Sequence, residues 1–399
     1  MIQPSSSERG SALILALIAT FLLLIVSFEV AHTTRIEAFI TKNVEVDFKL
    51  EVACRSGLER ALAILREDRQ NTEIDSLNDN WAQLFVDTEL TEADIGSSEF
   101  LRDDDPEEAQ AQTTLYIEIF DEAAKFNIYS LRSDDEAERR KRRERFGTLI
   151  DKFREDEEGD MSVVDGVSMA EQLTAFLERT EERPYHNVPV PPTKAAGGMN
   201  DVAELLYVDG FTPVNLWDRA TEDGEHVIPG LFRFLTIWSD MQVNINTAPL
   251  ATLASVFDPK YAYLADRIMD YREQSAEERE REKSRASETG SFDPNKGKEE
   301  QDPSGGAPFS QINDLREKVE GLGQDVYNEM QAFVTVQSTT FSVFVTAERG
   351  LLRRTKMFVV RRSEKGFQIC LEKPVDFPYL IPRDRRDQGA EQAEDRLGR

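Results

Sequence analysis

Residues that commonly carry out chemistry are few in this 399-residue chain and lie far apart. Its histidines and cysteines are His32, His186, His226, Cys54 and Cys370. A structural zinc site needs four such ligands at short spacings, and a nucleophilic site needs a base and an orienting group beside the nucleophile. These scattered residues form neither pattern, so we expect no zinc site and no enzyme activity.

Two acidic groupings could in principle do chemistry. Asp121 and Glu122 could form a catalytic carboxylate pair, but they follow a predicted strand, and adjacent strand residues point to opposite faces. Asp293, Asn295 and Glu299 carry the hard oxygen ligands that calcium prefers. The full twelve-residue calcium pattern is missing, so a disordered loop is the better interpretation, with calcium as an alternative.

The charge balance argues against nucleic acid as a partner. Acidic residues outnumber basic ones 76 to 48, which leaves a formal net charge of -28 and a field that repels phosphate backbones. The basic run Arg139–Arg145 has acidic stretches on both sides, so we expect it to be a solvated helix face or a contact for an acidic partner.

The N-terminal segment predicts a membrane anchor. Residues 11–28 carry no charge, and about 20 helical residues cross a bilayer core. The helical pattern then continues at spacings of three, four and seven residues, through Phe39, Val46, Leu50, Cys54, Leu58, Ala61 and Leu65. We therefore expect one helix over residues 11–66, half in lipid and half against a soluble domain. An ordinary signal anchor ahead of an unrelated domain is the alternative.

Three later segments alternate as half-buried strands do, and a fourth, residues 356–360, is rich in residues that favour strands. The expected apolar rows are Leu115, Ile117 and Ile119; Phe341, Val343 and Val345; and Phe367, Ile369 and Leu371. Such an antiparallel sheet needs a cover on one face, which the N-terminal helix can provide. Cys370 then lies opposite the apolar row, so a disulfide with Cys54 is not expected.

The region between these strands predicts helices. Two segments, Asn200–Phe211 and Asn313–Leu322, both place Asn-Asp before a short helix and a glycine after it, and they resemble diverged copies of one unit. A helix–hairpin–helix pattern spans residues 243–272, but Phe257–Tyr261 replaces the glycine-rich hairpin that would bind DNA phosphates. Protein docking or spacing is therefore the favoured role.

Several of these features together resemble the type II secretion minor pseudopilin K family. Gly10 and Ser11 match a prepilin cleavage junction, and the fifth position after it is Leu15, where most pseudopilins have Glu and the K type lacks it. Other motif residues of the resemblance are Asp121, Glu122, Asn127, Asn244, Asn246, Thr247, Ala248 and Arg272.

The resemblance implies an α+β fold, in which a pilin-like long N-terminal helix packs on an antiparallel sheet with a large all-α insertion, of helix–hairpin–helix or SAM-like type, between strands. The expected parts are a leader (1–10), the transmembrane and amphipathic helix (11–66), the first part of the head (67–131), the insertion (132–335) with a mobile loop (275–307), the C-terminal strands (336–378) and a disordered tail (379–399).

The implied function is assembly. A K-type subunit is expected at the tip of the type II secretion pseudopilus with minor pseudopilins I and J, where it starts or caps the filament for protein export. The resemblance further implies cleavage by prepilin peptidase, N-terminal methylation, an inner-membrane anchor with a cytoplasmic N-terminus and a periplasmic head, and an association with calcium. A tip pilin of a type IV pilus or competence system, or a membrane-anchored DNA-binding protein, is the alternative.

Overall fold

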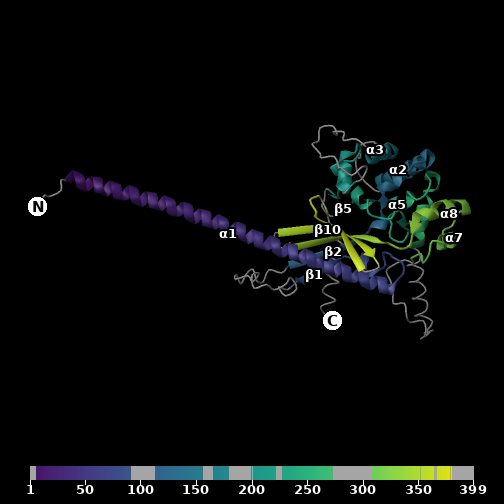
Figure 1. Ribbon diagram of the computed structural model, residues 1–399, viewed down its shortest axis with the longest axis horizontal. Helices are drawn as coiled ribbons and strands as arrows, with labels where there is room; N and C mark the ends of the chain where they lie inside the picture. Colours follow the sequence, from purple (N-terminus) through teal and green to yellow (C-terminus); the bar gives the residue numbers. More distant parts are fainter. Residues whose placement is uncertain are drawn as a thin grey trace, which may run out of the picture.

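The computed structural model describes residues 6–90, 113–155, 165–178, 199, 201–221, 227–272, 308–350, 352–363, 366–377 and 379. Helix α1 (Ser6–Asn71) is a single helix of 66 residues, or about 100 Å at ~1.5 Å per residue. It leaves the head as a long straight rod (Figure 1). It begins before and ends after the expected 11–66 span, and it includes the Gly10–Ser11 junction.

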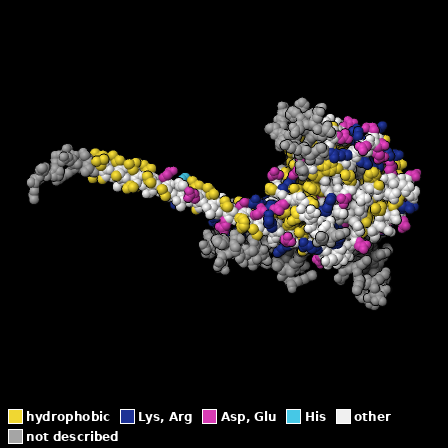
Figure 2. Space-filling view, viewed as in Figure 1, with side chains coloured by type: hydrophobic (Ala, Val, Ile, Leu, Met, Phe, Trp, Pro, Cys, Tyr) yellow, Lys and Arg dark blue, Asp and Glu magenta, His cyan; other side chains and the backbone are white. Residues whose placement is uncertain are grey.

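Between Leu13 and Val44, α1 makes no contact that buries its side chains. All side chains from Leu13 to Val44 are exposed, and most of those before Phe28 are apolar (Figure 2). The helix is long and apolar enough to cross a bilayer. Phe39, which we expected on the buried stripe, is 69 % exposed because the sheet covers only the later turns.

A five-stranded antiparallel sheet lies against the second half of α1. Its order is β1 (Phe85–Leu90), β2 (Thr113–Asp121), β9 (Thr340–Arg349), β10 (Leu352–Ser363) and β11 (Gly366–Pro374). The strands β2 and β9 are neighbours, although more than 200 residues separate them in the sequence. The insertion therefore leaves the sheet at the end of β2 and returns at β9.

The core between helix and sheet follows the two expected periodicities. Helix α1 contributes Leu50, Ala53, Cys54, Leu58, Ala61, Leu62 and Leu65, and the sheet contributes the expected rows from β2 and β9 with Phe358 and Val360 of β10. Gly57 lies in the same helical row, where an added Cβ would come within 2.4 Å of Val345 Cγ1. The row of small residues Ala53, Gly57 and Ala61 thus lets the helix approach β9 closely.

The edge strand β11 departs from the expected alternation. Leu371 pairs with Val359 and Ile369 with Val360, so Cys370 is the extra residue of a β-bulge. Because Val359 and Val360 face opposite sides of the sheet, the bulge puts Ile369 and Leu371 on opposite faces as well. The prediction that both belong to one inward row with Phe367 is wrong, and Ile369 is 46 % exposed.

The insertion covers the other face of the sheet, where it packs on Phe344 with Tyr116, Phe120 and Met357. Its helices group together on the side of the strands away from α1 (Figure 1). They are α2 (Glu136–Glu155), α3 (Gly166–Glu178), α4 (Pro213–Leu216), α5 (Leu250–Ala254), a helical stretch over residues 264–272, α7 (Asp314–Lys318) and α8 (Gln324–Met330).

The insertion is mainly helical but not all-α as expected. Short strands form three two-stranded pairings in the described residues: β3 (Phe126–Asn127) with β6 (Leu235–Thr236), β4 (Arg219–Ala220) with β5 (Val227–Ile228), and β7 (Val243–Asn244) with β8 (Val334–Thr335). The 3₁₀ turns in the described part of the insertion are η3 (Glu122–Ala124), η4 (Ile128–Leu131), η5 (Val202–Tyr207), η6 (Leu231–Arg233), η7 (Pro259–Tyr261) and η8 (Gln331–Phe333). A further turn, η1 (Asn80–Ala82), lies in the head between α1 and β1.

The two segments that resemble copies of one unit, Asn200–Phe211 and Asn313–Leu322, both end in the expected glycine, but their helices begin differently. Gly210 and Gly321 both have positive φ, 97° and 85°, which is the left-handed exit that glycine adopts without strain. Asp201 caps η5 by accepting a hydrogen bond from the Ala203 amide. In the second segment Asp314 lies inside α7 and accepts from the Ser310 amide instead.

Candidate functional site

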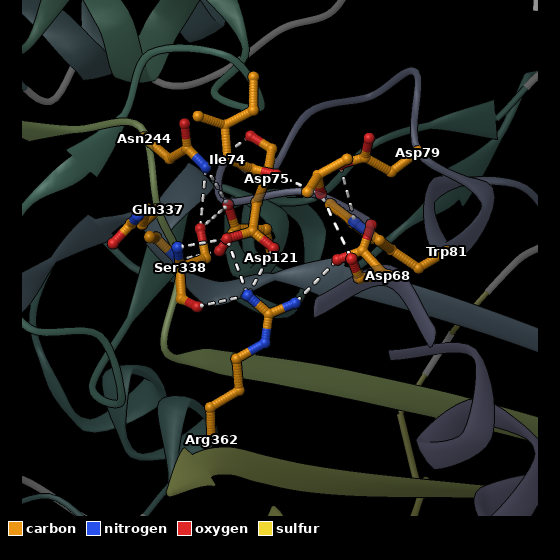
Figure 3. A network of polar contacts seen from close by, with 12 residues as sticks. Asp68, Ile74, Asp75, Asp79, Trp81, Asp121, Asn244, Gln337, Ser338 and Arg362 are labelled. Atoms are coloured by element: carbon orange, nitrogen blue, oxygen red, sulfur yellow. Dashed lines mark hydrogen bonds and ion pairs between the residues drawn. The ribbon is translucent and has the colours of Figure 1, made fainter. Parts of the chain in front are cut away.

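A buried polar junction joins the helix, the sheet and the insertion. It consists of Asp68, Asp75, Asp121, Asn244, Thr247, Ser338 and Arg362, which come from α1, the loop after it, β2, β7, the loops after β7 and β8, and β10 (Figure 3). Six of these residues are buried, with at most 8 % of their surface exposed, and the side chain of Arg362 is 13 % exposed. Three separate parts of the chain therefore meet at one dry set of hydrogen bonds.

Asp121 is the acceptor at the centre of the junction. Its Oδ2 accepts hydrogen bonds from Thr247 Oγ1 and Ser338 Oγ, both at 2.6 Å, and from Asn244 Nδ2 at 3.1 Å. Its Oδ1 accepts from the Ala123 amide at 2.7 Å. Burial raises the pKa of Asp121, while these donors act in the opposite direction. All of its hydrogen-bonding capacity is used inside the protein, so it serves as a structural anchor.

Arg362 is the cation of the junction. Its guanidinium contacts Asp68 Oδ2 at 2.9 Å and Asp75 Oδ1 at 2.7 Å, and it donates to the Ser338 carbonyl at 3.2 Å. Burial raises the pKa of Asp68 to about 7 and that of Asp75 to about 6, although the nearby arginine acts in the opposite direction. One guanidinium thus faces more carboxylates than it can neutralise, and their charge depends on pH near neutrality.

Glu122, the acid next to Asp121 in the expected motif, has a separate set of partners. Glu122 contacts Lys125 Nζ and accepts hydrogen bonds from Ser342 Oγ at 2.7 Å and from the Thr236 hydroxyl. Asn127 donates to the Ser239 carbonyl at 2.7 Å and accepts from the Tyr129 amide. The acids Asp121 and Glu122 therefore hold different loops, and this geometry gives no support to a catalytic pair.

The expected motif residues between Asn244 and Arg272 form hydrogen bonds that hold the insertion together; we call this set the internal brace. Asn246 makes two reciprocal hydrogen bonds with the backbone of Phe309, and Arg272 donates to the Ala248 carbonyl at 2.8 Å. The side chain of Arg272 therefore returns from the end of the 264–272 helix to the loop where the motif begins. Asn244 and Thr247 extend the brace to Asp121, so the structure brings the two expected motifs into direct contact.

The hairpin at Phe257–Tyr261 is closed by a neighbouring helix. Asp258 contacts Arg145 of α2 at 3.3 Å, and its carbonyl accepts from the Tyr261 amide at 2.8 Å. An acid and a proline stand at the position where a DNA-binding hairpin has phosphate-binding amides.

The basic run on α2 is largely neutralised within the protein. Arg139 contacts Glu136, Arg140 contacts Glu144, Lys141 contacts Glu329 and Arg143 lies 3.9 Å from Glu171. Arg142 donates to two backbone carbonyls. Each cation of the run named here therefore has an acidic or carbonyl partner within the chain, although Arg140 stays 80 % exposed and Lys141 44 % exposed.

The remaining expected site residues do not contribute to the junction. Leu15 is exposed on the apolar part of α1, and Gly10 and Ser11 lie in its first turns. Asp293, Asn295 and Glu299 fall outside the described residues. Within the described part of the chain, no group of three His, Cys, Asp or Glu side chains is arranged to hold a metal ion. Cys54 is buried, which raises its pKa to about 12, and Cys370 is exposed.

Sequence reasoning missed four participants of the junction, Asp68, Asp75, Ser338 and Arg362. Asp68 and Arg362 are separated by 294 positions, so no local pattern connects them. A usable signal was the position of Arg362, two residues after Val360 and therefore on the same face of the strand as the buried Phe358 and Val360. A charge at the end of a buried strand requires a partner, because burying it unpaired is costly.

Comparison with known proteins gives a similarity to a solved structure. No protein-family model and no curated protein matches the chain. Among solved structures, a chain of the GspK-GspI-GspJ complex from the type 2 secretion system of enterotoxigenic Escherichia coli matches with a TM-score of 0.52 and 14 % identity. The alignment covers 84 % of this chain and 98 % of that one. This chain has that fold. The expected pilin-like α+β architecture, with its helix on the sheet and its helical insertion, is confirmed.

Proposed function

We propose that this chain is a membrane-anchored minor pseudopilin of the K type, a component of the pseudopilus of a type II secretion system. One observation carries the proposal. The single helix α1 is apolar and exposed from Leu13 to Phe28, and its later turns pack against a sheet. A helical insertion separates the strands of that sheet in the sequence. The shared fold with a chain of the GspK-GspI-GspJ complex supports it. Assembly, and not catalysis, is the activity that follows.

A place at the tip of the filament, with partners of the I and J type, is the finer part of the proposal. It is supported by Leu15, because a subunit with leucine at this position offers no carboxylate to the N-terminal amine of a neighbour in lipid. The same proposal includes cleavage after Gly10, methylation of Ser11, and insertion in the inner membrane with a periplasmic head. A tip pilin of a type IV pilus remains the alternative assignment.

The proposal is tested by co-purification. The full-length chain, expressed with the minor pseudopilins I and J of its own organism and extracted in detergent, should elute with both in one complex. A matched control replaces the partners with the major pseudopilin alone, which should not be retained. If the chain elutes without I and J at concentrations where they bind one another, the tip assignment fails.

A further inference from the structure

The short segment after the edge strand β11 packs between the sheet and the insertion. Its described residues are Val375, Asp376, Phe377 and Tyr379, and we call them the clasp. The Val375 amide donates to the Thr355 carbonyl of β10 at 3.0 Å, which ties the start of the clasp to the sheet. The three apolar members of the clasp pack in the core that the sheet shares with the insertion.

The two rings of the clasp contact different partners. The ring of Phe377 stacks on Trp217 of the insertion, with centroids 4.2 Å apart, and meets Phe232 edge-on at 5.2 Å. The ring of Tyr379 stacks on Phe344 of β9, with centroids 4.3 Å apart. Rings in these arrangements attract one another in addition to the area that they bury. One short segment thus contacts both the insertion and the strand that lies beneath it.

Polar groups fasten the same segment on both sides. The Tyr379 hydroxyl donates to the carboxylate of Glu118, a buried residue of β2. Arg233 of the insertion lies over the Tyr379 ring, 5.3 Å from its centroid. Directly before the clasp, Lys373 of β11 contacts Asp201, which caps η5. Because a buried polar group without a partner is costly, these contacts favour a single position of the clasp.

The sheet by itself offers the insertion limited apolar contact. On this face Phe344 is buried in the shared core, and the other apolar residues of the described strands that reach it are partly buried: Val86, Tyr116, Phe120 and Met357. By contrast, the apolar rows of β2 and β9 under α1 are buried. The clasp therefore adds aromatic contact on the face where the sheet alone provides less of it.

The position of the clasp allows it to detach while the sheet stays paired. It follows an edge strand, so its departure leaves every pairing of the five-stranded sheet in place. A small cavity lined by Trp217, Phe232, Phe344 and Phe377, among others, already lies beside it. Incompletely packed segments at the margin of a sheet open locally at a lower cost than central strands do.

We propose that the clasp is a conformational strap, which holds the insertion on the sheet when it is closed and lets the insertion move away from the sheet when it is open. The core between α1 and the sheet stays intact in both states, because the clasp packs in the other core. The inference concerns the head alone and does not depend on the filament assignment.

The test measures the distance between the insertion and the sheet in the full-length chain in detergent micelles. Spin labels are attached to the native, exposed Cys370 of β11 and to Val214→Cys of α4, a position that is 55 % exposed, while Cys54 is buried. Double electron–electron resonance should give one narrow distance with the clasp intact. With Phe377→Ala and Tyr379→Ala together, a population at longer distances should appear. An unchanged distribution overturns the proposal.

Amide hydrogen exchange of the same proteins shows whether the loosening stays local. Exchange in η5, α4 and η6 should become roughly tenfold faster in the double variant, and exchange in Leu50–Leu65 of α1 should change less than about twofold. Equal acceleration in the two regions means general destabilisation and overturns the proposal.

Two further variants make the test specific. Tyr263→Ala is the matched control, because it removes a half-exposed aromatic ring elsewhere on the insertion and should leave both the distance and the exchange unchanged. If circular dichroism shows that the double variant does not fold, Phe377→Leu decides. It keeps an apolar side chain but loses the stacked ring, so exchange in α4 and η6 should become roughly threefold faster. Unchanged exchange in folded Phe377→Leu then overturns the clasp.

Discussion

Asn244 connects three parts of the chain through one amide group. Its Nδ2 lies within hydrogen-bond distance of the Asp75 carbonyl, Asp121 Oδ2 and Ser338 Oγ, while its Oδ1 accepts from the Asn246 amide. The residue is fully buried. Each of these groups would remain in a dry environment if the amide were removed, so the junction depends on this residue more than on any exposed ion pair.

We therefore expect Asn244→Ala to lower the free energy of unfolding by about 2–3 kcal/mol, because buried acceptors lose their donor. The measurement is urea unfolding of the full-length chain in detergent, followed by circular dichroism. Asn328→Ala on the exposed face of α8 is the control and should change stability by less than about 0.5 kcal/mol. Equal effects of the two substitutions would contradict the role of the junction.

The carboxylates around Arg362 predict a pH dependence. The folded pKa of Asp68, about 7, lies above its usual value of 3.8, so the folded state holds a proton that the unfolded state releases. Its contribution to stability is full below pH 4 and is lost as the pH rises towards 7. Asp75 and Asp79 shift in the same direction, and Arg362 opposes the shift.

Unfolding free energy should accordingly fall between pH 5 and pH 7, and Asp68→Asn should make this slope shallower by up to ~1.4 kcal/mol per pH unit. Urea titrations at several pH values measure it. Comparison of the variant with the parent cancels the general repulsion of the acidic chain, and Asp325→Asn on exposed α8 controls for the loss of one negative charge. Parallel slopes for the parent and Asp68→Asn would refute the assignment.

At the scale of elements, the contact between α1 and β9 sets how closely the helix packs on the sheet. Gly57 is the point of closest approach, since a Cβ there would lie 2.4 Å from Val345 Cγ1 and 3.3 Å from Cγ2. Exposed glycines inside helices usually gain stability on replacement by alanine, by about 1 kcal/mol. Here the neighbouring strand takes the space that the methyl group would need.

Gly57→Ala should therefore destabilise the head by about 1–2 kcal/mol despite the better helix propensity, because overpacking costs more than propensity contributes. The same substitution in a Val345→Ala background should be neutral or stabilising. The four proteins of this double-mutant cycle can be compared by thermal unfolding. A loss of the same size in both backgrounds would show that the helix and strand are not in the contact described here.

At the scale of the whole molecule, the distribution of charge predicts that the chain does not bind DNA. The chain carries a net charge of -28, and the cations of Arg139–Arg145 contact acids or carbonyls of the same chain. We expect no electrophoretic shift of DNA by the full-length chain in detergent, even at low salt where phosphate contacts are strongest. A shift at low salt that disappears at moderate salt would favour a DNA receptor over a pseudopilin.

Patterns with a short period could be read from the sequence. The apolar run, the stripe Leu50–Leu65 and the rows of β2 and β9 were predictable, because burial against one face imposes a period of about 3.6 residues on a helix and of two on a strand. The positive φ of Gly210 and Gly321 was equally local. These features established a helix on a sheet with an inserted helical region.

Only the tertiary structure decided which distant residues contact one another. Register determines the bulge at Cys370, the pairing of β1 and the short strand pairings of the insertion. A shift of one residue in register moves every side chain of a strand to the opposite face, although the composition of the strand stays the same. The junction at Asp121 and the contact between Arg145 and Asp258 join residues more than 100 positions apart. Such polar contacts leave no periodic trace in the sequence, because a hydrogen bond is set by the distance and direction between two particular groups and not by which face is buried.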